Sequence, residues 1–89
     1  MTSPSPDDIE AVILRLARER GVDKSICPSE AARELGGTHP DGWGPLMIPV
    51  RRVAVRLAQE GRLVVLRKGK PVDPADFKGV YRLSLPRLD

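Results

Sequence analysis

Apolar residues recur at helical spacing between Leu46 and Gly61. If a helix runs on from Pro49, one of its sides is apolar and carries Val50, Val53, Ala54, Leu57 and Gly61. The opposite side carries Arg51, Arg52, Val55, Arg56 and Gln59. Spacings of three and four residues separate two such sets onto the two faces of an α-helix. We therefore expect a helix from about Leu46 or Pro49 to Glu60 that packs with one face and presents positive charge with the other.

An earlier helix is predicted to begin after Ser5. This serine suits the N-cap, and Pro6 suits the first helical position because its missing N–H would have no partner there. Gly21 suits the end of the helix, where a left-handed conformation is common. The predicted buried stripe consists of Ile9, Val12, Ile13, Leu16 and Ala17. We expect this helix to be scaffold, preceded by a flexible N-terminal tail over residues 1–6.

A second, short helix is predicted after Cys27, with Pro28 at its first position and Glu30 at its third. Its inward residues are Ala31, Ala32 and Leu35, and it ends at Gly36-Gly37. An isolated helix of about two turns is unstable in water, so packing on its neighbours must hold it. The residues before it, Ser25–Cys27, form either coil or a small first strand.

Two strands are predicted behind the basic helix. Arg62–Lys68 is a run of β-branched residues and leucine that is apolar on both faces, which favours a strand covered on both sides. Val80–Leu85 alternates in the manner of a half-buried partner strand, with Tyr81, Leu83 and Leu85 inward. Between them we expect a loop, Gly69–Gly79, in which Asp73-Pro74-Ala75-Asp76 caps one helical turn.

This order of elements predicts an α+β fold, a winged helix-turn-helix with three helices followed by a two-stranded β-hairpin wing. The domain is expected over residues 7–86. A chain of 89 residues forms one domain and is too short for a catalytic cleft between two domains. Each helix has a single apolar stripe, which favours a monomer and leaves the oligomeric state open.

Few residues suggest catalysis or metal binding. The chain has one cysteine, Cys27, and one histidine, His39, which are too few for a disulfide framework or a closed zinc site. Cys27 precedes a predicted helix, where a thiolate is stabilised, but no second cysteine or fixed base accompanies it. We expect Cys27 to act as a small buried hydrophobe, Trp43 to anchor the core and His39 to lie in an exposed turn. Neither enzymatic activity, nor a metal, nor another cofactor is expected.

The compartment is predicted from two missing signals. No run approaches the roughly 18 apolar residues of a membrane span. Residues 1–8 lack the basic and apolar regions of a signal peptide. We therefore expect a cytoplasmic protein with no membrane partner.

Charge is distributed unevenly along the chain. Residues 1–44 carry five basic and eight acidic side chains, a net charge of −3, whereas residues 45–89 carry ten basic and four acidic ones, a net charge of +6. A domain that faces a polyanion shows such segregation, because neutralising phosphates releases counterions and supplies most of the non-specific affinity. A bias of the coding sequence toward arginine would produce the same charge distribution in a chain that has no polyanionic partner.

The basic helix and the hairpin supply the candidate binding residues. On the helix, arginine suits guanine edges or phosphate and glutamine suits adenine, while lysines around the wing suit the neighbouring backbone. The expected nucleic-acid-binding residues are Arg51, Arg52, Arg56, Gln59, Arg67, Lys68, Lys70 and Lys78. We expect binding of duplex DNA, as in a transcriptional regulator.

Two alternatives stay open at this point, and one of them, an enzymatic role, rests on Cys27 alone. Winged helices also serve as protein–protein modules, in which the same arginines would meet an acidic partner. Val55 on the polar face fits both readings, since it suits either a thymine methyl group or a small protein interface.

The same residues carry a resemblance to a known family. The blocks concerned are Ile26–Glu30, Val50–Gly61, Arg67–Pro74 and Phe77–Gly79. They resemble the small bacterial family catalogued as domain of unknown function 3253, over roughly Ile9 to Leu85. The resemblance implies a winged-helix-like domain with no established activity. Its recurring polar positions fall on Cys27, Pro28, Ser29, Arg51, Arg52, Arg56, Arg67, Lys68 and Asp73. They imply either a site or, for Asp73 and Arg52, an ion pair that fixes the wing to the helix.

Overall fold

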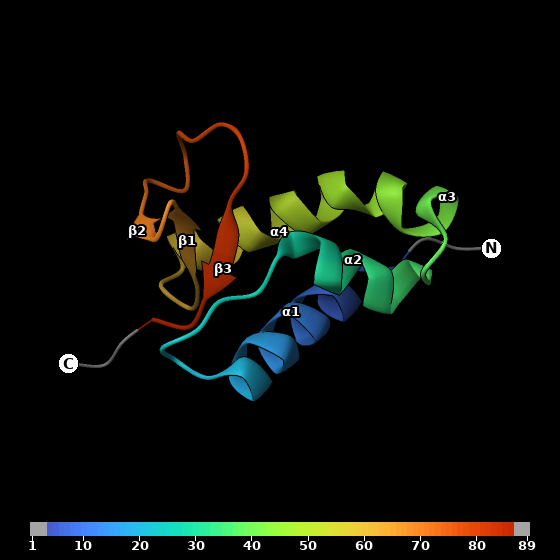
Figure 1. The fold of residues 1–89 in the computed structure, drawn as a ribbon, viewed down its shortest axis with the longest axis horizontal. Coiled ribbons are helices and arrows are strands. Elements are labelled where there is room, and N and C mark those ends of the chain that lie inside the picture. The colour runs from blue at the N-terminus through green and yellow to red at the C-terminus, as the bar shows by residue number, and fades with distance from the viewer. Residues whose placement is uncertain (1–3, 87–89) are drawn as a thin grey trace.

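Three helices of nine residues or more lie against one another, and a small antiparallel sheet closes one end of them (Figure 1). The structure is a computed structural model that describes residues 4–86. Its elements are α1 (Pro6–Arg20), α2 (Pro28–Gly36), α3 (Pro40–Trp43), the 3₁₀ turn η1 (Gly44–Leu46), α4 (Met47–Gln59), β1 (Val64–Arg67), β2 (Lys70–Pro71) and β3 (Arg82–Ser84). The fold is α+β and is compatible with a winged-helix arrangement, as predicted.

The start of α1 follows the predicted capping chemistry. The Ser5 hydroxyl accepts a hydrogen bond from the Asp8 N–H at 3.1 Å, and the Asp8 carboxylate accepts from the Ser5 N–H at 3.3 Å. These two bonds satisfy N–H groups that have no partner within the helix. Gly21 ends α1 at φ +102°. Residues 1–3 of the predicted flexible tail lie outside the described residues, and Pro6 already belongs to the helix.

The segment after α2 is more ordered than its many turn-forming residues suggest. It contains α3 and η1, each with a proline in its first turn, where the missing N–H costs nothing. The end of α2 approaches α3 closely, because a Cβ atom on Gly42 would lie 2.3 Å from the Gly36 carbonyl oxygen. Trp43 is half-buried against the core, and the Arg33 guanidinium stands 4.7 Å from the centre of its ring. His39 is exposed, as predicted.

The sheet has three strands in the order β2-β1-β3, all antiparallel. The predicted loop Gly69–Gly79 is therefore wrong at its start, where β2 pairs with β1. Lys68 and Gly69 form the two-residue turn with φ values of +53° and +80°, the signs that a type I′ hairpin turn requires. Ile26 forms a single isolated bridge to Leu83, so the segment before α2 is coil that touches the sheet at one residue and not a strand of its own.

The predicted helical turn after β2 is also absent from the described residues. Asp73 instead closes a non-helical turn, in which its carboxylate accepts from the Ala75 N–H at 2.9 Å and its carbonyl accepts from the Asp76 N–H at 3.1 Å. We call residues 72–81, which lead from β2 to β3, the wing loop. Figure 1 shows this loop rising beside α4, whereas α1 lies at the opposite side of the molecule.

The core lies where α1, α2 and α4 meet one face of the sheet. The predicted inner face of α4 is fully confirmed for its helical residues, since Val50, Val53, Ala54 and Leu57 are all buried. Ile9, Ile13 and Ala17 are buried on α1, while Val12 and Leu16 are half-buried. On β3 the predicted alternation fails only at Ser84, which is buried and donates its hydroxyl to the Lys24 carbonyl at 3.0 Å.

No helix among residues 4–86 covers the other face of the sheet. Val64 and Leu66 of β1 are half-buried there and line an open groove of about 600 Å³ together with residues 22–25. The expectation that β1 is covered on both sides is therefore wrong for this face. Within residues 4–86, no helix is long and apolar enough to cross a membrane.

Candidate nucleic-acid interface

The face of α4 opposite the core carries Ile48, Arg52, Val55 and Gln59, which we call the outer stripe. They follow one another at spacings of four, three and four residues, so they lie in one row along the helix. Arg52 and Gln59 are exposed and form no hydrogen bond or ion pair with any residue that the structure describes. Ile48 is 68% exposed. Val55 is half-buried and packs against the core, so it is less available than the sequence suggested.

Arg51 does not belong to the outer stripe. Its guanidinium lies 3.9 Å from the centre of the Phe77 ring and 5.5 Å from that of Tyr81, and it donates a hydrogen bond to the Phe77 carbonyl at 2.9 Å. A guanidinium over an aromatic face is attracted by the negative charge of that face. Arg51 therefore holds the wing loop on α4. Because its guanidinium is engaged by Phe77, the predicted role of Arg51 as a base or phosphate contact is not supported.

Arg67 supports the wing loop from the strand side. Its Nε donates to the Val80 carbonyl at 3.0 Å. Gly79 passes directly over this guanidinium, since a Cβ atom there would lie 2.9 Å from an Arg67 nitrogen, and its φ is +88°. The two arginines thus fix the second half of the loop, at Phe77 and at Val80, and Lys78 lies between these two points. Lys78 is exposed and forms no hydrogen bond or ion pair with the residues that the structure describes.

Arg56 lies on the flank of α4 that meets α1. It forms an ion pair with Glu10 at 2.8 Å, and Arg62 reaches the same carboxylate oxygen at 3.3 Å. Arg56 remains 44% exposed, so it still faces solvent. One carboxylate therefore offsets part of the charge of two arginines at this end of the predicted interface.

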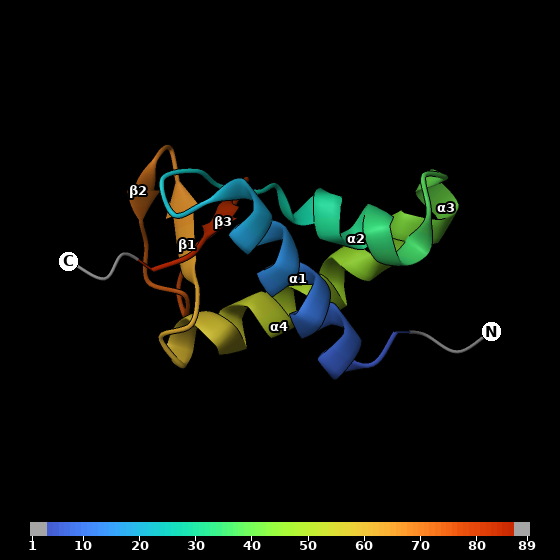
Figure 2. The ribbon, with the colours of Figure 1, turned by 90° about the horizontal axis from the view of Figure 1, so that it is seen from below.

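Lys68 and Lys70 lie at the β1–β2 turn, apart from the predicted binding residues of α4. Figure 2 shows β1 running away from the end of α4, so the β1–β2 turn lies at the far end of this strand. Gly69 and Pro71 accordingly line the same groove as Val22 and Lys24. The length of β1 thus separates the β1–β2 turn from the end of α4.

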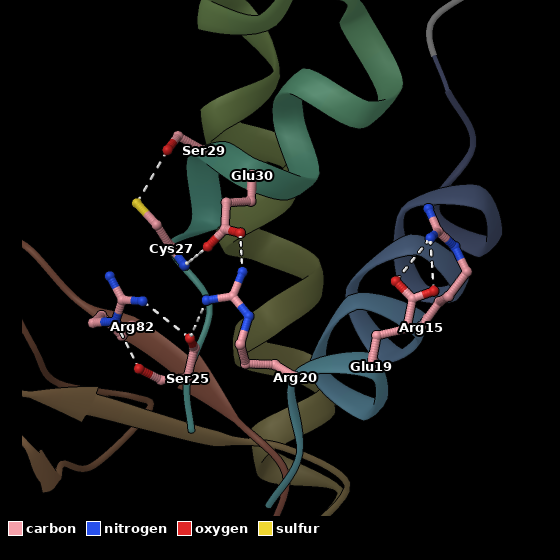
Figure 3. A network of polar contacts seen from close by, with 8 residues as sticks. All are labelled: Arg15, Glu19, Arg20, Ser25, Cys27, Ser29, Glu30 and Arg82. Carbon is pink, nitrogen blue, oxygen red and sulfur yellow. Dashed lines mark hydrogen bonds and ion pairs between the residues drawn. The ribbon is translucent and has the colours of Figure 1, made fainter. Parts of the chain in front are cut away.

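The polar residues around the start of α2 form a network that joins α1, α2 and β3 (Figure 3). The Glu30 carboxylate accepts from the Cys27 N–H at 2.7 Å and pairs with Arg20. Burial opposes the ionised form of Glu30, but these two partners prevail and lower the pKa of its carboxyl group. From β3, the Arg82 Nε donates to the Ser25 hydroxyl at 2.6 Å. This arrangement accounts for Glu30, Arg20 and Arg82 as structural residues.

Cys27 and Asp73 were candidates from the family resemblance. The Cys27 thiol is half-buried and lies 3.0 Å from the Ser29 hydroxyl. Asp73 caps its own turn and forms no ion pair with Arg52, so the proposed clamp between wing and helix is absent. Arg51 makes that connection instead. In the part of the chain that the structure describes, no group of three or more His, Cys, Asp and Glu side chains could hold a metal ion.

The structure thus reduces the eight predicted residues to a smaller set. Arg52, Gln59 and Lys78 are exposed and free of protein partners among residues 4–86, on the outer stripe and the wing loop. Ile48 joins them, although it was not among the residues predicted from the sequence. The spacing could have found it, because Ile48 lies four residues before Arg52 and seven before Val55.

The sequence pattern of one protein family matches residues 6–86. The family is described as "Protein of unknown function (DUF3253)". The match covers most of the chain, so the protein belongs to this family. No curated protein matches the chain.

Proposed function

We propose that this member of the DUF3253 family is a non-enzymatic domain that binds duplex DNA through the outer stripe of α4 and the wing loop. The outer stripe would enter the major groove, which is about 12 Å wide and admits an α-helix. Arg52 would contact a guanine edge or a phosphate, and Gln59 an adenine. Lys78 would contact the adjacent backbone from the wing loop. Such a domain suits a bacterial, cytoplasmic transcriptional regulator.

The observation that carries this proposal is the free guanidinium of Arg52. The other arginines of α4 have protein partners, Arg51 at Phe77 and Arg56 at Glu10, and Arg52 has none among the described residues. Contacts within the fold account for Arg51 and Arg56, but no contact among residues 4–86 accounts for Arg52. The net charge of +6 on residues 45–89 supports a polyanionic partner for it.

The test is the affinity for a labelled duplex measured by fluorescence anisotropy over a range of salt concentrations. The logarithm of the association constant should fall linearly with the logarithm of the salt concentration. The double variant Arg52→Ala with Lys78→Ala should bind more weakly and with a slope shallower by about two.

The matched control removes the same charge elsewhere, with Arg18→Ala on α1 and Lys70→Ala on β2. Both side chains are exposed and lie outside the proposed interface. Equal losses in the two double variants, or no binding at low salt, would show that the proposed interface is wrong.

A second candidate is favoured by the groove on the open face of the sheet. Its lining combines the apolar residues Val64, Leu66 and Leu85 with Asp23 and Lys24. Lys68 and Lys70 flank the Gly69 that also lines it. A protein segment with apolar and acidic side chains fits this chemistry. If duplex affinity is absent while substitution of Lys24 and Lys70 abolishes binding of an acidic partner, this second function replaces the first.

A further inference from the structure

Ile48 is a large apolar side chain that the fold leaves in water. It is 68% exposed on the second residue of α4, although the same helix buries Val50, Val53 and Leu57. A single exposed isoleucine is common on protein surfaces. This one, however, lies one helical turn before Arg52, in the same row of side chains and at the end of α4 next to η1.

The chemistry of the major groove indicates which bases suit an isoleucine and an arginine that lie one helical turn apart. Thymine is the base that presents a methyl group there, and guanine presents two acceptors, N7 and O6, that match a guanidinium. On the premise of the proposed DNA binding, we infer that Ile48 and Arg52 together read a thymine close to a guanine. Ile48 contacts the thymine methyl group, and Arg52 contacts the guanine edge. Ile48 is then a specificity-determining residue of this interface.

The dimensions agree with this assignment. Side chains four residues apart on a helix lie about 5–6 Å from each other at Cβ. Successive base pairs are about 3.4 Å apart along the duplex. A helix that lies across the groove therefore brings Ile48 and Arg52 to base pairs that are neighbours or next neighbours. Val55, the other apolar member of the outer stripe, is half-buried and offers less surface to a methyl group.

The experiment begins with the chain itself and a pool of duplexes randomised at their centre. The best-bound duplex is then compared with copies in which single thymines are replaced by deoxyuridine, which removes only the methyl group, and single guanines by 7-deazaguanine, which removes only N7. The variants are Ile48→Ala and Arg52→Ala, with Val22→Ala as the matched control. Val22 is 48% exposed and lies outside the proposed interface.

We expect the pool to enrich a thymine within two base pairs of a guanine. Loss of that methyl group should weaken binding by the intact chain about fourfold, the effect of removing one buried methyl-sized group. Ile48→Ala should bind the thymine and deoxyuridine duplexes equally, while Arg52→Ala should lose the response to 7-deazaguanine. Val22→Ala should behave as the intact chain.

Two results overturn the inference while the proposed function stands. One is salt-dependent binding without enrichment of any sequence, and the other is a methyl effect that is absent in the intact chain or persists in Ile48→Ala. Absence of duplex binding by the intact chain at low salt would overturn both. The inference and the proposed function therefore fail in distinguishable ways.

Discussion

The guanidinium of Arg51 lies 3.9 Å from the centre of the Phe77 ring and donates a hydrogen bond to the carbonyl of the same residue at 2.9 Å. Phe77 is buried and contacts Tyr81 edge to face, with ring centres 5.1 Å apart. One arginine of α4 thus holds both the backbone and the ring of a residue 26 positions later in the chain. The wing loop owes its position beside the outer stripe to this contact.

Arg51→Ala should lower the free energy of unfolding by about 1–3 kcal/mol, because a charged hydrogen bond and a cation–π contact are lost together. The corresponding fall in melting temperature is about 4–8 °C per kcal/mol for a domain of this size. Thermal and urea unfolding measure it. Arg52→Ala is the matched control and should stay within about 0.5 kcal/mol of the unmodified chain, since its side chain is exposed without a partner among residues 4–86. Equal losses in the two variants would contradict the assigned roles.

Tyr81 should titrate at a higher pH in the folded chain than in the unfolded one. Burial raises the pKa of its hydroxyl group above 10.0, and the nearby charge of Arg51 opposes only part of this shift. The neutral form therefore stabilises the fold at lower pH, and that contribution is lost as the pH rises from about 10 through the folded pKa. Tyr81 is the only tyrosine, so the ultraviolet absorbance of tyrosinate reports this residue alone in folded and urea-unfolded samples.

Tyr81→Phe should remove this alkaline loss of stability. The hydroxyl is buried without a hydrogen-bond partner among the described residues, so at neutral pH its removal should be neutral or stabilising by up to about 1 kcal/mol. A folded chain that ionises at or below the pH of the unfolded one, or a Tyr81→Phe variant that is strongly destabilised at neutral pH, would contradict the prediction.

Local capping chemistry was readable from the sequence. Ser5, Pro6 and Gly21 begin and end α1 through contacts with residues only a few positions away in the chain, and the structure places α1 between them. The predicted hairpin joined residues 62–68 to residues 80–85, and the tight hairpin between β1 and β2 was not predicted, because Lys68 is not one of the asparagine or aspartate residues that usually begin a type I′ turn. Pro71 also argued against a strand, and it fits β2 because proline is tolerated at the edge of a sheet.

The candidate site was less predictable than the fold, for a different reason. Helical spacing assigns each arginine to a face of α4, but it says nothing of partners that are distant in the chain. Arg51 meets Phe77 at a separation of 26 residues, and Arg56 meets Glu10 at a separation of 46. Such contacts depend on how the elements pack, so sequence spacing overstated the number of free cations.

Glu10→Gln should strengthen duplex binding, because it removes the carboxylate that Arg56 and Arg62 share. If the released Arg56 reaches a phosphate, the salt dependence should steepen by about 0.9. The loss of stability should stay below about 1 kcal/mol, as is usual for partly exposed ion pairs. Glu19→Gln is the matched control, since Glu19 pairs with Arg15 on another side of α1. Anisotropy titrations measure the duplex affinity of both variants. An equal increase in affinity in Glu19→Gln would mean that only net charge matters.

The separation of the lysines gives the most direct test of the interface. Lys78→Ala should weaken duplex binding and make its salt dependence shallower by about one, because this lysine lies in the wing loop next to the residue that Arg51 holds. Lys68→Asn and Lys70→Ala remove the same charge at the β1–β2 turn, and asparagine tolerates the positive φ of residue 68. We expect both to bind within about twofold of the unmodified chain, a difference below about 0.5 kcal/mol. If the turn variants lose as much affinity as Lys78→Ala, the duplex also contacts the edge of the sheet beside residues 22–25, and the interface extends around the molecule rather than along α4.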